Sequence, residues 1–288
     1  MYRVFWILFL LLASHLAHAA CSREILVPFS ELGVDQWQRE GVRAGLSIEF
    51  LEEVSRRSGC RFVYTDVPRA RAWLMFARGE ADVVLGAVRS ARRDEAGSFY
   101  SQHIEEGVSL VSLKAHPLHL ESREAILASG LAFTFVRGHD YGPRTAELIS
   151  KLMARGSVAL VKDPKAMLRM LEAGRVDGAI VLSSAITADA TSLGHDQMLT
   201  GVVVEDLDWT TAGLYMSKHL PPEDQQLLDH VFTELNEEDF YIHLAEGLLK
   251  AQPAWVQASI RLQHQFPLHV VDQISPSPIM DWPHEPIR

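Results

Sequence analysis

The chain has 288 residues, a formal net charge of −10 at pH 7 and two cysteines, Cys21 and Cys60. An acidic chain is a poor nucleic-acid binder, because such binding depends on Lys and Arg side chains that neutralise phosphates. The length suits one large domain or two lobes of ordinary size, and we expect a monomer without a nucleic-acid partner.

Residues 1–20 have the pattern of a secretory signal peptide. Arg3 gives a positive start, Val4 to Leu12 is an apolar run, and Ala17-His18-Ala19 has the small-x-small form that signal peptidase cuts. The apolar run is shorter than the about 20 residues of a membrane-spanning helix, and no later stretch reaches that length. We therefore expect the signal to be removed and the rest of the chain to be exported to the periplasm.

Each cysteine stands just before a strand-like run, Cys21 before Glu24–Val27 and Cys60 before Phe62–Tyr64. If the two strands are parallel neighbours, their first residues lie about 5 Å apart, which a disulfide can span. An oxidising compartment favours that pairing. The alternative is a lipid-modified Cys21, since Ala19-Ala20 precede it, although His18 stands where a lipobox usually has Leu.

Short β-rich runs alternate with helical patterns, which is typical of parallel sheets covered by helices. An apolar face from Leu46 to Val54 predicts a helix that ends at Gly59, and Asp163-Pro164 predicts the capped start of another. The expected strands are residues 25–29, 62–66, 81–88, 107–113, 132–136, 158–161 and 178–182.

One segment of the chain is echoed by a later one. Phe76–Val84 and Leu171–Ala179 each contain a helix end, a glycine, a short loop with an aspartate, and an apolar strand. Each follows a strand–helix–strand–helix run, so the echo predicts two lobes of similar build.

Changes in composition suggest where the lobes meet. Pro117 and the polar residues 119–123 follow a strand that leaves the first lobe, and prolines after Gln252 argue against a long regular element there. The expected division is lobe one at residues 21–112 plus 207–250, lobe two at 113–206, and a Pro-rich C-terminal extension at 251–288.

With these elements placed, the chain resembles the bacterial extracellular solute-binding proteins of family 3, periplasmic proteins that bind polar amino acids. Gly45–Leu51 is similar to the start of the family's first helix. Gly79–Asp82 and Gly174–Asp177 are similar to its glycine-x-x-aspartate turns, and Ser90–Arg93 to its threonine-x-x-arginine motif. The resemblance covers Glu24 to Leu249. It implies an α/β fold of the periplasmic binding protein type II kind, with two Rossmann-like lobes that are joined by hinge strands and close over a ligand.

The residues that follow the first-lobe strands predict an anion site. Ligands of open α/β sheets bind outside the carboxyl ends of the strands. Here those positions include Phe29, Arg69 and Arg89 to Arg93, and Arg offers a bidentate fork for carboxylate or phosphate. An anion can also use the free N–H groups of the helix that Ser90 would cap. Arg93 resembles the family arginine that grips the carboxylate of the ligand.

The other candidate residues have two interpretations each. Arg69 stands where the family often places an aromatic wall, so it is a ligand contact or a surface ion pair. Phe29 belongs to the core or to the cleft, and Trp73 is expected in the core rather than as a stacking platform. In lobe two, Gly138–Tyr141 matches a family loop that contacts the ligand. Its His139 either changes charge near neutral pH or, like most single histidines in loops, has no such role.

Two positions depart from the amino-acid binders of the family. Leu182 stands where they carry an aspartate that pairs with the ammonium group, and Val88 stands where a Thr often contacts the ligand. Without the acid, an ammonium group in a dry cleft is uncompensated, which is costly. We therefore expect a small organic anion or an amino-acid-like ligand. The residues expected to contact it are Arg93, Ser90, Arg69, Phe29, Val88, His139, Asp140, Tyr141 and Ser183.

The main rival function is enzymatic, because a few relatives of this fold are dehydratases. The chain has no G-x-S-x-G or H-E-x-x-H motif and no phosphate-binding glycine loop. His116 and His119 have no evident third metal ligand nearby in the sequence. Glu105 and Glu106 are the candidates for acid–base catalysis, although any pair of surface carboxylates would qualify equally. A sensor or partner module that has lost its ligand is the third candidate. We expect a non-catalytic binding protein without metal or cofactor, which serves an ABC permease or a sensor of the inner membrane.

Overall fold

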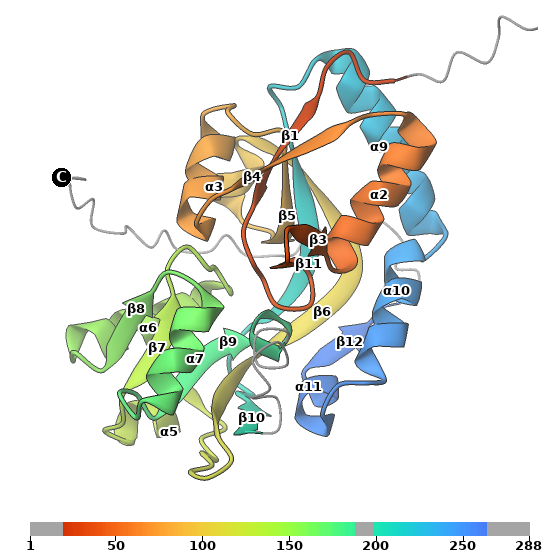
Figure 1. The fold of residues 1–288 in the computed structure, drawn as a ribbon. Helices are drawn as coiled ribbons and strands as arrows, with labels where there is room; N and C mark the ends of the chain where they lie inside the picture. Colours follow the sequence, from red (N-terminus) through yellow and green to blue (C-terminus); the bar gives the residue numbers. More distant parts are fainter. Residues whose placement is uncertain (1–19, 188–197, 264–288) are drawn as a thin grey trace, which may run out of the picture.

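The computed structural model describes residues 20–187 and 198–263 (Figure 1). Apart from Ala20, the expected signal sequence lies outside the described residues, as does the C-terminal extension beyond residue 263. No helix in the described ranges is long and apolar enough to cross a membrane. The elements are, in chain order, β1 (Ile25–Phe29), β2 (Trp37–Arg39), β3 (Val42–Ala44), α2 (Leu46–Ser58), β4 (Phe62–Asp66), α3 (Arg69–Ala77), β5 (Val83–Val88), α4 (Ala91–Asp94), β6 (Gly97–Leu113), α5 (Arg123–Ala128), β7 (Phe133–Val136), α6 (Pro143–Ala154), β8 (Val158–Val161), α7 (Pro164–Glu172), β9 (Gly178–Leu182), β10 (Leu199–Val203), β11 (Trp209–Ser217), α9 (Pro222–Glu237), α10 (Phe240–Leu249), α11 (Ala254–Ala258) and β12 (Ile260–Leu262).

Lobe one contains β1, β4, β5, β11 and the first half of β6, with helices α2, α3, α9 and α10 around them (Figure 1). The strands β1 and β4 are parallel neighbours, as the placement of the cysteines required. Helices α2, α9 and α10 bury an aromatic cluster of Phe50, Phe232 and Tyr241. The helix α2 ends at Gly59 with a left-handed backbone, φ 71°, which glycine adopts without steric cost.

Lobe two contains β7, β8, β9, β10 and the second half of β6, with helices α5, α6 and α7. Alternate strand residues face opposite sides of the sheet, so Phe135 packs with Leu148 of α6 while Val181 packs with Met167 of α7. The carboxylate of Asp163 accepts a hydrogen bond from the N–H of Ala166 at 2.7 Å, which is the expected cap of α7. The predicted α/β fold with two lobes is confirmed.

The two lobes share one long strand, β6, which has 17 residues. Its first half pairs with β11, and its second half pairs with β9 and β10. We expected a strand only over residues 107–113, because polar residues such as Gln102 and Glu106 interrupt the apolar pattern before it. The predicted start of the strand at residue 107 was wrong. The polar side chains of Gln102 and Glu106 are buried within the protein, so they do not mark a loop exposed to solvent.

The two glycine-x-x-aspartate turns make the same pair of hydrogen bonds. The Asp82 carboxylate accepts from the N–H of Leu26 at 2.8 Å, and the Asp82 N–H donates to the Leu26 carbonyl at 2.8 Å. Asp177 and Ala132 form the equivalent bonds at 2.8 Å and 2.7 Å. Each aspartate therefore fixes the beginning of a neighbouring strand, and the echo in the sequence corresponds to a repeated structural unit.

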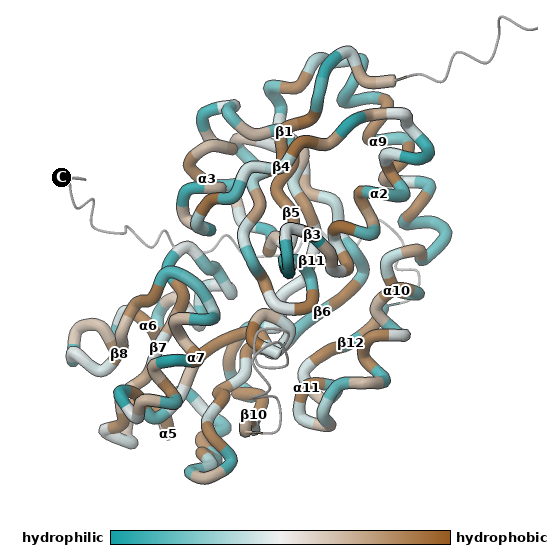
Figure 2. Tube along the Cα trace, viewed as in Figure 1, coloured by the Kyte–Doolittle hydropathy of each residue, from teal (hydrophilic) through white to brown (hydrophobic). Residues whose placement is uncertain are grey.

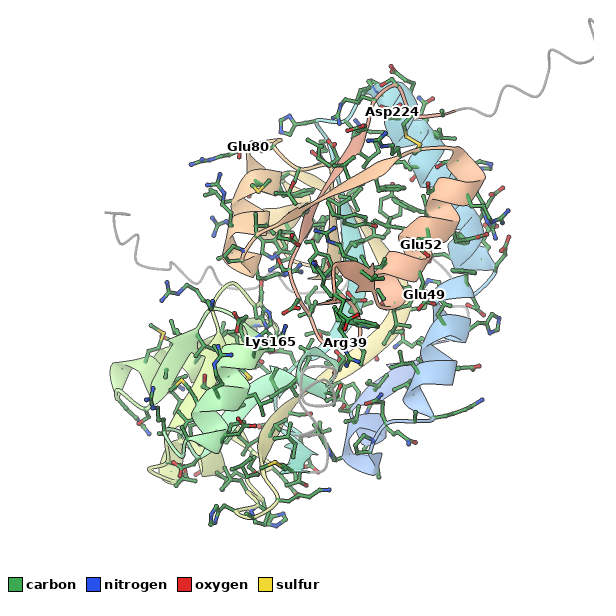
Figure 3. All side chains as sticks on the ribbon, in the orientation of Figure 1. Arg39, Glu49, Glu52, Glu80, Lys165 and Asp224 are labelled. Atoms are coloured by element: carbon green, nitrogen blue, oxygen red, sulfur yellow. A yellow bond between two sulfur atoms is a disulfide. The ribbon has the colours of Figure 1, made fainter. Side chains whose placement is uncertain are left out.

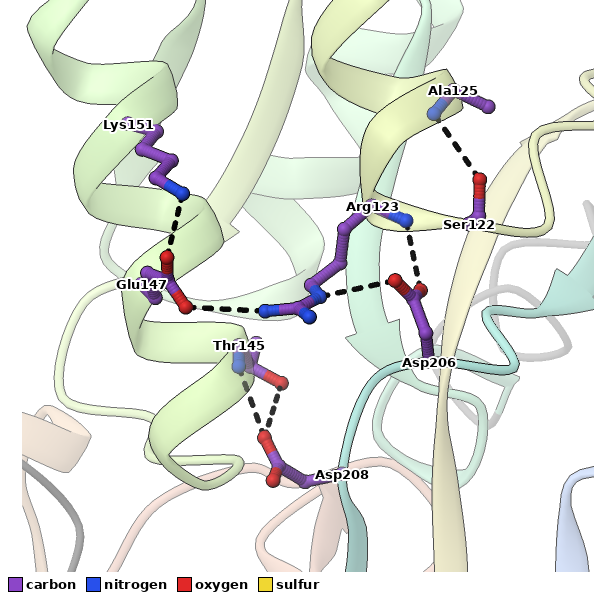
Figure 4. A network of polar contacts seen from close by, with 8 residues as sticks. All are labelled: Ser122, Arg123, Ala125, Thr145, Glu147, Lys151, Asp206 and Asp208. Carbon is purple, nitrogen blue, oxygen red and sulfur yellow. Dashed lines mark hydrogen bonds and ion pairs between the residues drawn. The ribbon is translucent and has the colours of Figure 1, made fainter.

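Acidic residues hold the segment that returns from lobe two to lobe one (Figure 4). Asp206 accepts from the N–H of Arg123 at 2.8 Å, and the Arg123 guanidinium lies 3.1 Å from Glu147 of α6. Asp208 accepts from the N–H of Thr145 at 3.0 Å. Because a carboxylate already occupies the N-terminus of α6, that helix start does not offer an anion site.

Cys21 and Cys60 form a disulfide, with their Cα atoms 4.8 Å apart. Figure 3 shows it at the end of lobe one near Asp224, which accepts a hydrogen bond from the N–H of Ser22 at 2.7 Å. The predicted pairing is confirmed. A sulfur atom in a disulfide does not carry a thioether lipid, so the structure represents the first of the two alternatives for Cys21.

The described part of the C-terminal extension forms the short helix α11 and the strand β12, and β12 adds to β6. In Figure 2, hydrophobic residues concentrate on the central strands such as β1 and β9, and hydrophilic residues on the outer loops. Val256 of α11 is also fully buried. Residues 254–262 are therefore packed against β6 as short elements, in keeping with the expectation that the prolines prevent a long regular element.

Candidate functional site

A cavity lies between the two lobes, and residues of both line it. Its lining from lobe one includes the start of α3, the end of β5 and the helix α4. Lobe two contributes the loop 138–141 and the end of β9. These are carboxyl ends of strands, where open α/β sheets bind ligands. Six of the residues expected at the ligand line this cavity, namely Arg69, Val88, Arg93, His139, Asp140 and Tyr141.

The lobes touch each other beside the cavity. The N–H of Val34 in lobe one donates to the carbonyl of Ser184 in lobe two at 3.0 Å. Lys165 of α7, labelled in Figure 3, forms an ion pair with Glu31 of lobe one at 2.5 Å. The structure is therefore a closed arrangement of the two lobes.

Arg93 lies in α4 and directs part of its guanidinium to the protein backbone. Its Nη1 donates to the carbonyl of Val88 at 2.6 Å. Burial lowers the pKa of the Arg93 guanidinium, and the charge of Asp140 across the cavity opposes that shift. No carboxylate of the described residues lies within ion-pair distance of Arg93, so its positive charge has no direct partner of the opposite sign.

Arg69 lies at the start of α3 and is nearly fully buried, with 6% of its surface exposed. Its Nη1 and Nη2 donate to the carbonyls of Leu85 and Gly86 at 2.8 Å and 2.6 Å. Burial, together with the charge of Arg93, lowers the pKa of Arg69 to about 9. Within the described ranges Arg69 forms no ion pair, so the alternative of a surface salt bridge does not hold.

Trp73 of α3 serves as a platform for both arginines. The guanidinium carbons of Arg93 and Arg69 lie 3.8 Å and 4.9 Å from the centroid of the indole ring. Edge contacts with Phe76 and Tyr215 hold the ring in place. The expectation of a plain core residue was incomplete, because the ring face stabilises two desolvated cations.

His139 and Tyr141 form a buried pair in the loop from lobe two. The Nδ1 atom of His139 is hydrogen-bonded to the hydroxyl of Tyr141. Burial, together with the charges of Arg69 and Arg93, lowers the pKa of His139 to about 3. Of the two interpretations of His139, the structure favours the one without a change of charge near neutral pH, because burial disfavours the imidazolium.

Three of the expected contact residues do not line the cavity. Phe29 lines an adjacent hollow between the lobes, and the hydroxyl of Ser183 donates to Glu106 at 2.9 Å. Ser90 makes no side-chain cap, and its carbonyl accepts from the N–H groups of Arg93 and Asp94, both at 3.0 Å. Because α4 has only four residues, it offers few free N–H groups to an anion.

Two buried acids also line the cavity. The Asp35 carboxylate accepts from the Ser47 hydroxyl at 2.6 Å and from the Tyr241 hydroxyl. Glu106 accepts from the N–H and the hydroxyl of Ser184 at 2.7 Å and 2.6 Å, in addition to Ser183. Burial raises the pKa of both carboxyl groups. Nothing in the local pattern around Asp35 marked it, since its partners come from α2 and α10.

Gln102 and Leu182 also line the cavity. The Oε1 atom of Gln102 is buried and has no hydrogen-bond partner among the described residues, so it can accept a hydrogen bond from a ligand. Leu182 lies at the end of β9, where its residue lines the cavity and its side chain packs on the core of lobe two. In the part of the chain that the structure describes, no three His, Cys, Asp or Glu side chains are arranged to hold a metal ion.

Comparison with known proteins identifies the fold. No family model matches the chain, and no curated protein matches its sequence. Solved structures match it over most of its length. A histidine kinase sensor domain with similarity to periplasmic binding proteins has a TM-score of 0.65 at 15% identity, covering 79% of this chain and 96% of its own.

Two further solved structures have the same fold. The arginine-, lysine-, histidine-binding protein ArtJ of Geobacillus stearothermophilus has a TM-score of 0.65 at 14% identity, covering 81% of this chain and 97% of its own. The ancestral amino-acid-binding protein AncCDT-1, a precursor of cyclohexadienyl dehydratase, has a TM-score of 0.63 at 14% identity, covering 82% and 98%. The chain therefore has the fold of the periplasmic binding proteins.

Proposed function

We propose that the protein is an extracytoplasmic solute-binding protein that captures a small organic anion between its lobes. Arg93 is the principal anchor of the anion, and Arg69 is the second. The observation that carries the proposal is that Arg69 is buried and Arg93 half-buried beside a cavity, and that both guanidinium groups lack a carboxylate partner among the described residues. A bound carboxylate would supply the missing charge and accept charge-assisted hydrogen bonds.

The proposed ligand carries a carboxylate and does not need an ammonium group. The side chain at position 182 is leucine, and Glu106 beside it already accepts three hydrogen bonds from Ser183 and Ser184. An ammonium group near Leu182 would therefore find no carboxylate that is free to pair with it. Leaving a charged group unpaired in a desolvated site is costly. Asp140 is the one cavity carboxylate near Arg93, and it would compensate an ammonium only if the ligand bound with that group toward the loop.

The proposed partner is a membrane protein that recognises the closed conformation of this protein. Proteins with this fold include substrate-binding proteins of amino-acid ABC transporters and a histidine kinase sensor domain. Delivery to an ABC permease and signalling to a sensor both require a closed state that differs from the open one.

Native mass spectrometry of the freshly purified protein tests the proposal. We expect a complex whose additional mass, after release and fragmentation, is that of an organic acid. Calorimetry with the identified acid should then show one site per chain. A thermal-shift survey of carboxylates that finds no ligand would contradict the proposal and would favour a module without a ligand.

A dehydratase activity is the second candidate. The observation in its favour is that Asp35 and Glu106 line the cavity with pKa values raised by burial, which suits a proton donor or acceptor. Incubation of the protein with its identified ligand, followed by mass analysis of the solution, distinguishes the two candidates. Loss of water from the ligand would establish the enzyme, and an unchanged ligand supports the binding protein.

A further inference from the structure

The floor of the cavity is a row of apolar side chains that crosses several strands. Ala212 of β11 lies directly opposite Val88 of β5 on one side and Ile104 of β6 on the other. Directly opposite residues of antiparallel strands share one face of a sheet. All three residues line the cavity, so the floor is apolar from β5 to β6.

The floor continues beyond β6 onto the C-terminal strand. Ile260 of β12 lies opposite Glu106 of β6 and lines the same cavity. The distance from β5 across β11 and β6 to β12 comprises three strand spacings, which is about 14 Å. The cavity is therefore elongated across the sheet, from lobe one's arginines toward the end of the described chain.

The two ends of this floor differ in chemistry. At the β5 end, Arg93 and Arg69 line the cavity and donate to the carbonyls of β5. A guanidinium has five N–H groups, so each arginine has donors beyond those that these bonds use. At the β12 end, the lining from α10 and α11 is mainly aliphatic, namely Ala245, Leu248, Leu249 and Val256. The polar exceptions on this side are Tyr241, whose hydroxyl donates to Asp35, and Gln252. Asp35 and Glu106, which lie between the ends, are already occupied by hydrogen bonds from the protein.

We propose that the ligand is an organic acid whose carboxylate is joined to an apolar chain or ring, and that α10, α11 and β12 form the subsite for this apolar part. The inference rests on the proposed function, because it assumes the carboxylate at Arg93. A simple polar amino acid would leave the aliphatic end of the cavity unfilled. An elongated apolar acid fills the floor and removes its apolar surface from water.

Straight-chain monocarboxylates from acetate to octanoate are the probe, measured by calorimetry on protein freed of any co-purified ligand. We expect the affinity to rise about fourfold for each added methylene group, because each buried CH₂ contributes a similar hydrophobic increment. The rise should stop when the chain reaches the end of the floor.

A matched pair of variants on α10 locates the subsite. Leu249 lines the cavity, whereas Leu244 is half-buried on the same helix, packs on the core of lobe one and is absent from the cavity lining. Leu249→Gln should remove most of the gain for hexanoate and octanoate, about tenfold or more, and leave butanoate unchanged. Leu244→Gln should leave the dependence on chain length as in the unaltered protein.

The outcomes separate this inference from the proposed function. Acids that need Arg93 but bind with an affinity independent of chain length would overturn the apolar subsite and leave the anion site standing. Equal effects of Leu249→Gln and Leu244→Gln would also overturn it. If no acid binds and Arg93→Ala has no effect with any anion, the proposed function itself fails.

Discussion

Two arginine side chains determine the character of the site. Arg93 and Arg69 lie against one indole ring and donate to carbonyls of β5, so their positions do not depend on a ligand. Preorganised guanidinium groups lose little conformational freedom when they bind a carboxylate. The positive charge is therefore positioned before the ligand binds, in surroundings of low dielectric where its attraction for an anion is strongest.

Replacement of Arg93 by alanine tests the anchor. Loss of a buried charge-assisted pair typically costs about 2–5 kcal/mol, so affinity for the identified ligand should fall by some 30-fold to several thousand-fold. Arg92→Ala, at the exposed neighbouring position, is the control and should bind as the unaltered protein does. Calorimetry measures both. A decrease of less than threefold for Arg93→Ala would show that Arg93 is not the anchor.

His139 predicts a pH dependence of stability. Its pKa is about 3 in the folded protein against an ordinary value of 6.5, so the unfolded chain takes up the proton first as the pH falls. The stabilisation is complete above about pH 6.5 and is lost as the pH falls toward 3. Between pH 7 and pH 5 the free energy of unfolding should decrease by about 2 kcal/mol more than in His139→Asn.

Urea unfolding at the two pH values measures this difference. His230→Asn replaces an exposed histidine of α9 and should follow the unaltered protein at both pH values. If His139→Asn also follows the unaltered protein, His139 is not held neutral in the folded state.

At the scale of elements, short strands are fixed at their beginnings. The disulfide joins the segments that lead into β1 and β4, and Asp82 bonds the backbone of β1. Asp177 does the same next to β7 in lobe two. These strands have only four or five residues each, so the hydrogen bonds between them contribute little stability on their own. The disulfide and the two aspartates therefore help to fix how the strands are aligned.

Removal of the disulfide should destabilise lobe one. Cys21 and Cys60 are separated by 39 positions, and the chain-entropy model gives roughly 4 kcal/mol for a loop of that length. Unfolding of the Cys21→Ser/Cys60→Ser protein should show this loss in free energy without a change of fold. Labelling of the unreduced, unfolded protein should find no free thiol, and two reactive thiols or a lipid on Cys21 would contradict the pairing.

At the scale of the whole molecule, the proposed function depends on closure of the two lobes. The loop at Gly33–Val34 meets Ser184, and Glu31 meets Lys165, both from opposite lobes. A ligand favours the closed state only if it contacts both lobes, and the cavity has lining residues from each. Small-angle scattering should show compaction on saturation with the ligand, and an unchanged radius of gyration would count against closure.

Gly33→Ala should block this closure. Gly33 has φ +54°, and a Cβ atom there would overlap the Ser184 carbonyl oxygen of the other lobe. The clash exists only when the lobes are together, so the variant should fold but bind at least tenfold more weakly. Gly41→Ala is the matched control, because Gly41 has φ +82° and no atom lies within 4 Å of the position that a Cβ atom would take there. Calorimetry and scattering on both variants separate the clash from backbone strain. If Gly33→Ala and Gly41→Ala bind the ligand with equal affinity, the contact between Gly33 and Ser184 does not form in solution.

The sequence alone determined most elements of the fold. It favoured the disulfide over a lipid on Cys21, and it pointed to the two arginines that are proposed for the site. Strands such as 25–29 and 178–182, the glycine end of α2 and the capped start of α7 depend on neighbouring residues, so their patterns are visible along the chain. The echo around Asp82 and Asp177 is visible for the same reason, since each turn is a local unit. The residues proposed for the lobe-two loop also follow directly from the end of a strand.

Only the tertiary structure decided what surrounds the arginines. Asp35 meets Tyr241 across 206 positions of sequence, and β12 brings Ile260 beside Glu106. No local pattern encodes these contacts, because they arise when α10 and the C-terminal segment pack against β6. The neutral state of His139 and the apolar end of the cavity likewise come from burial by distant elements. The desolvation of the site and the shape of the cavity depend on which distant segments of the chain pack together. Local sequence patterns do not reveal that packing.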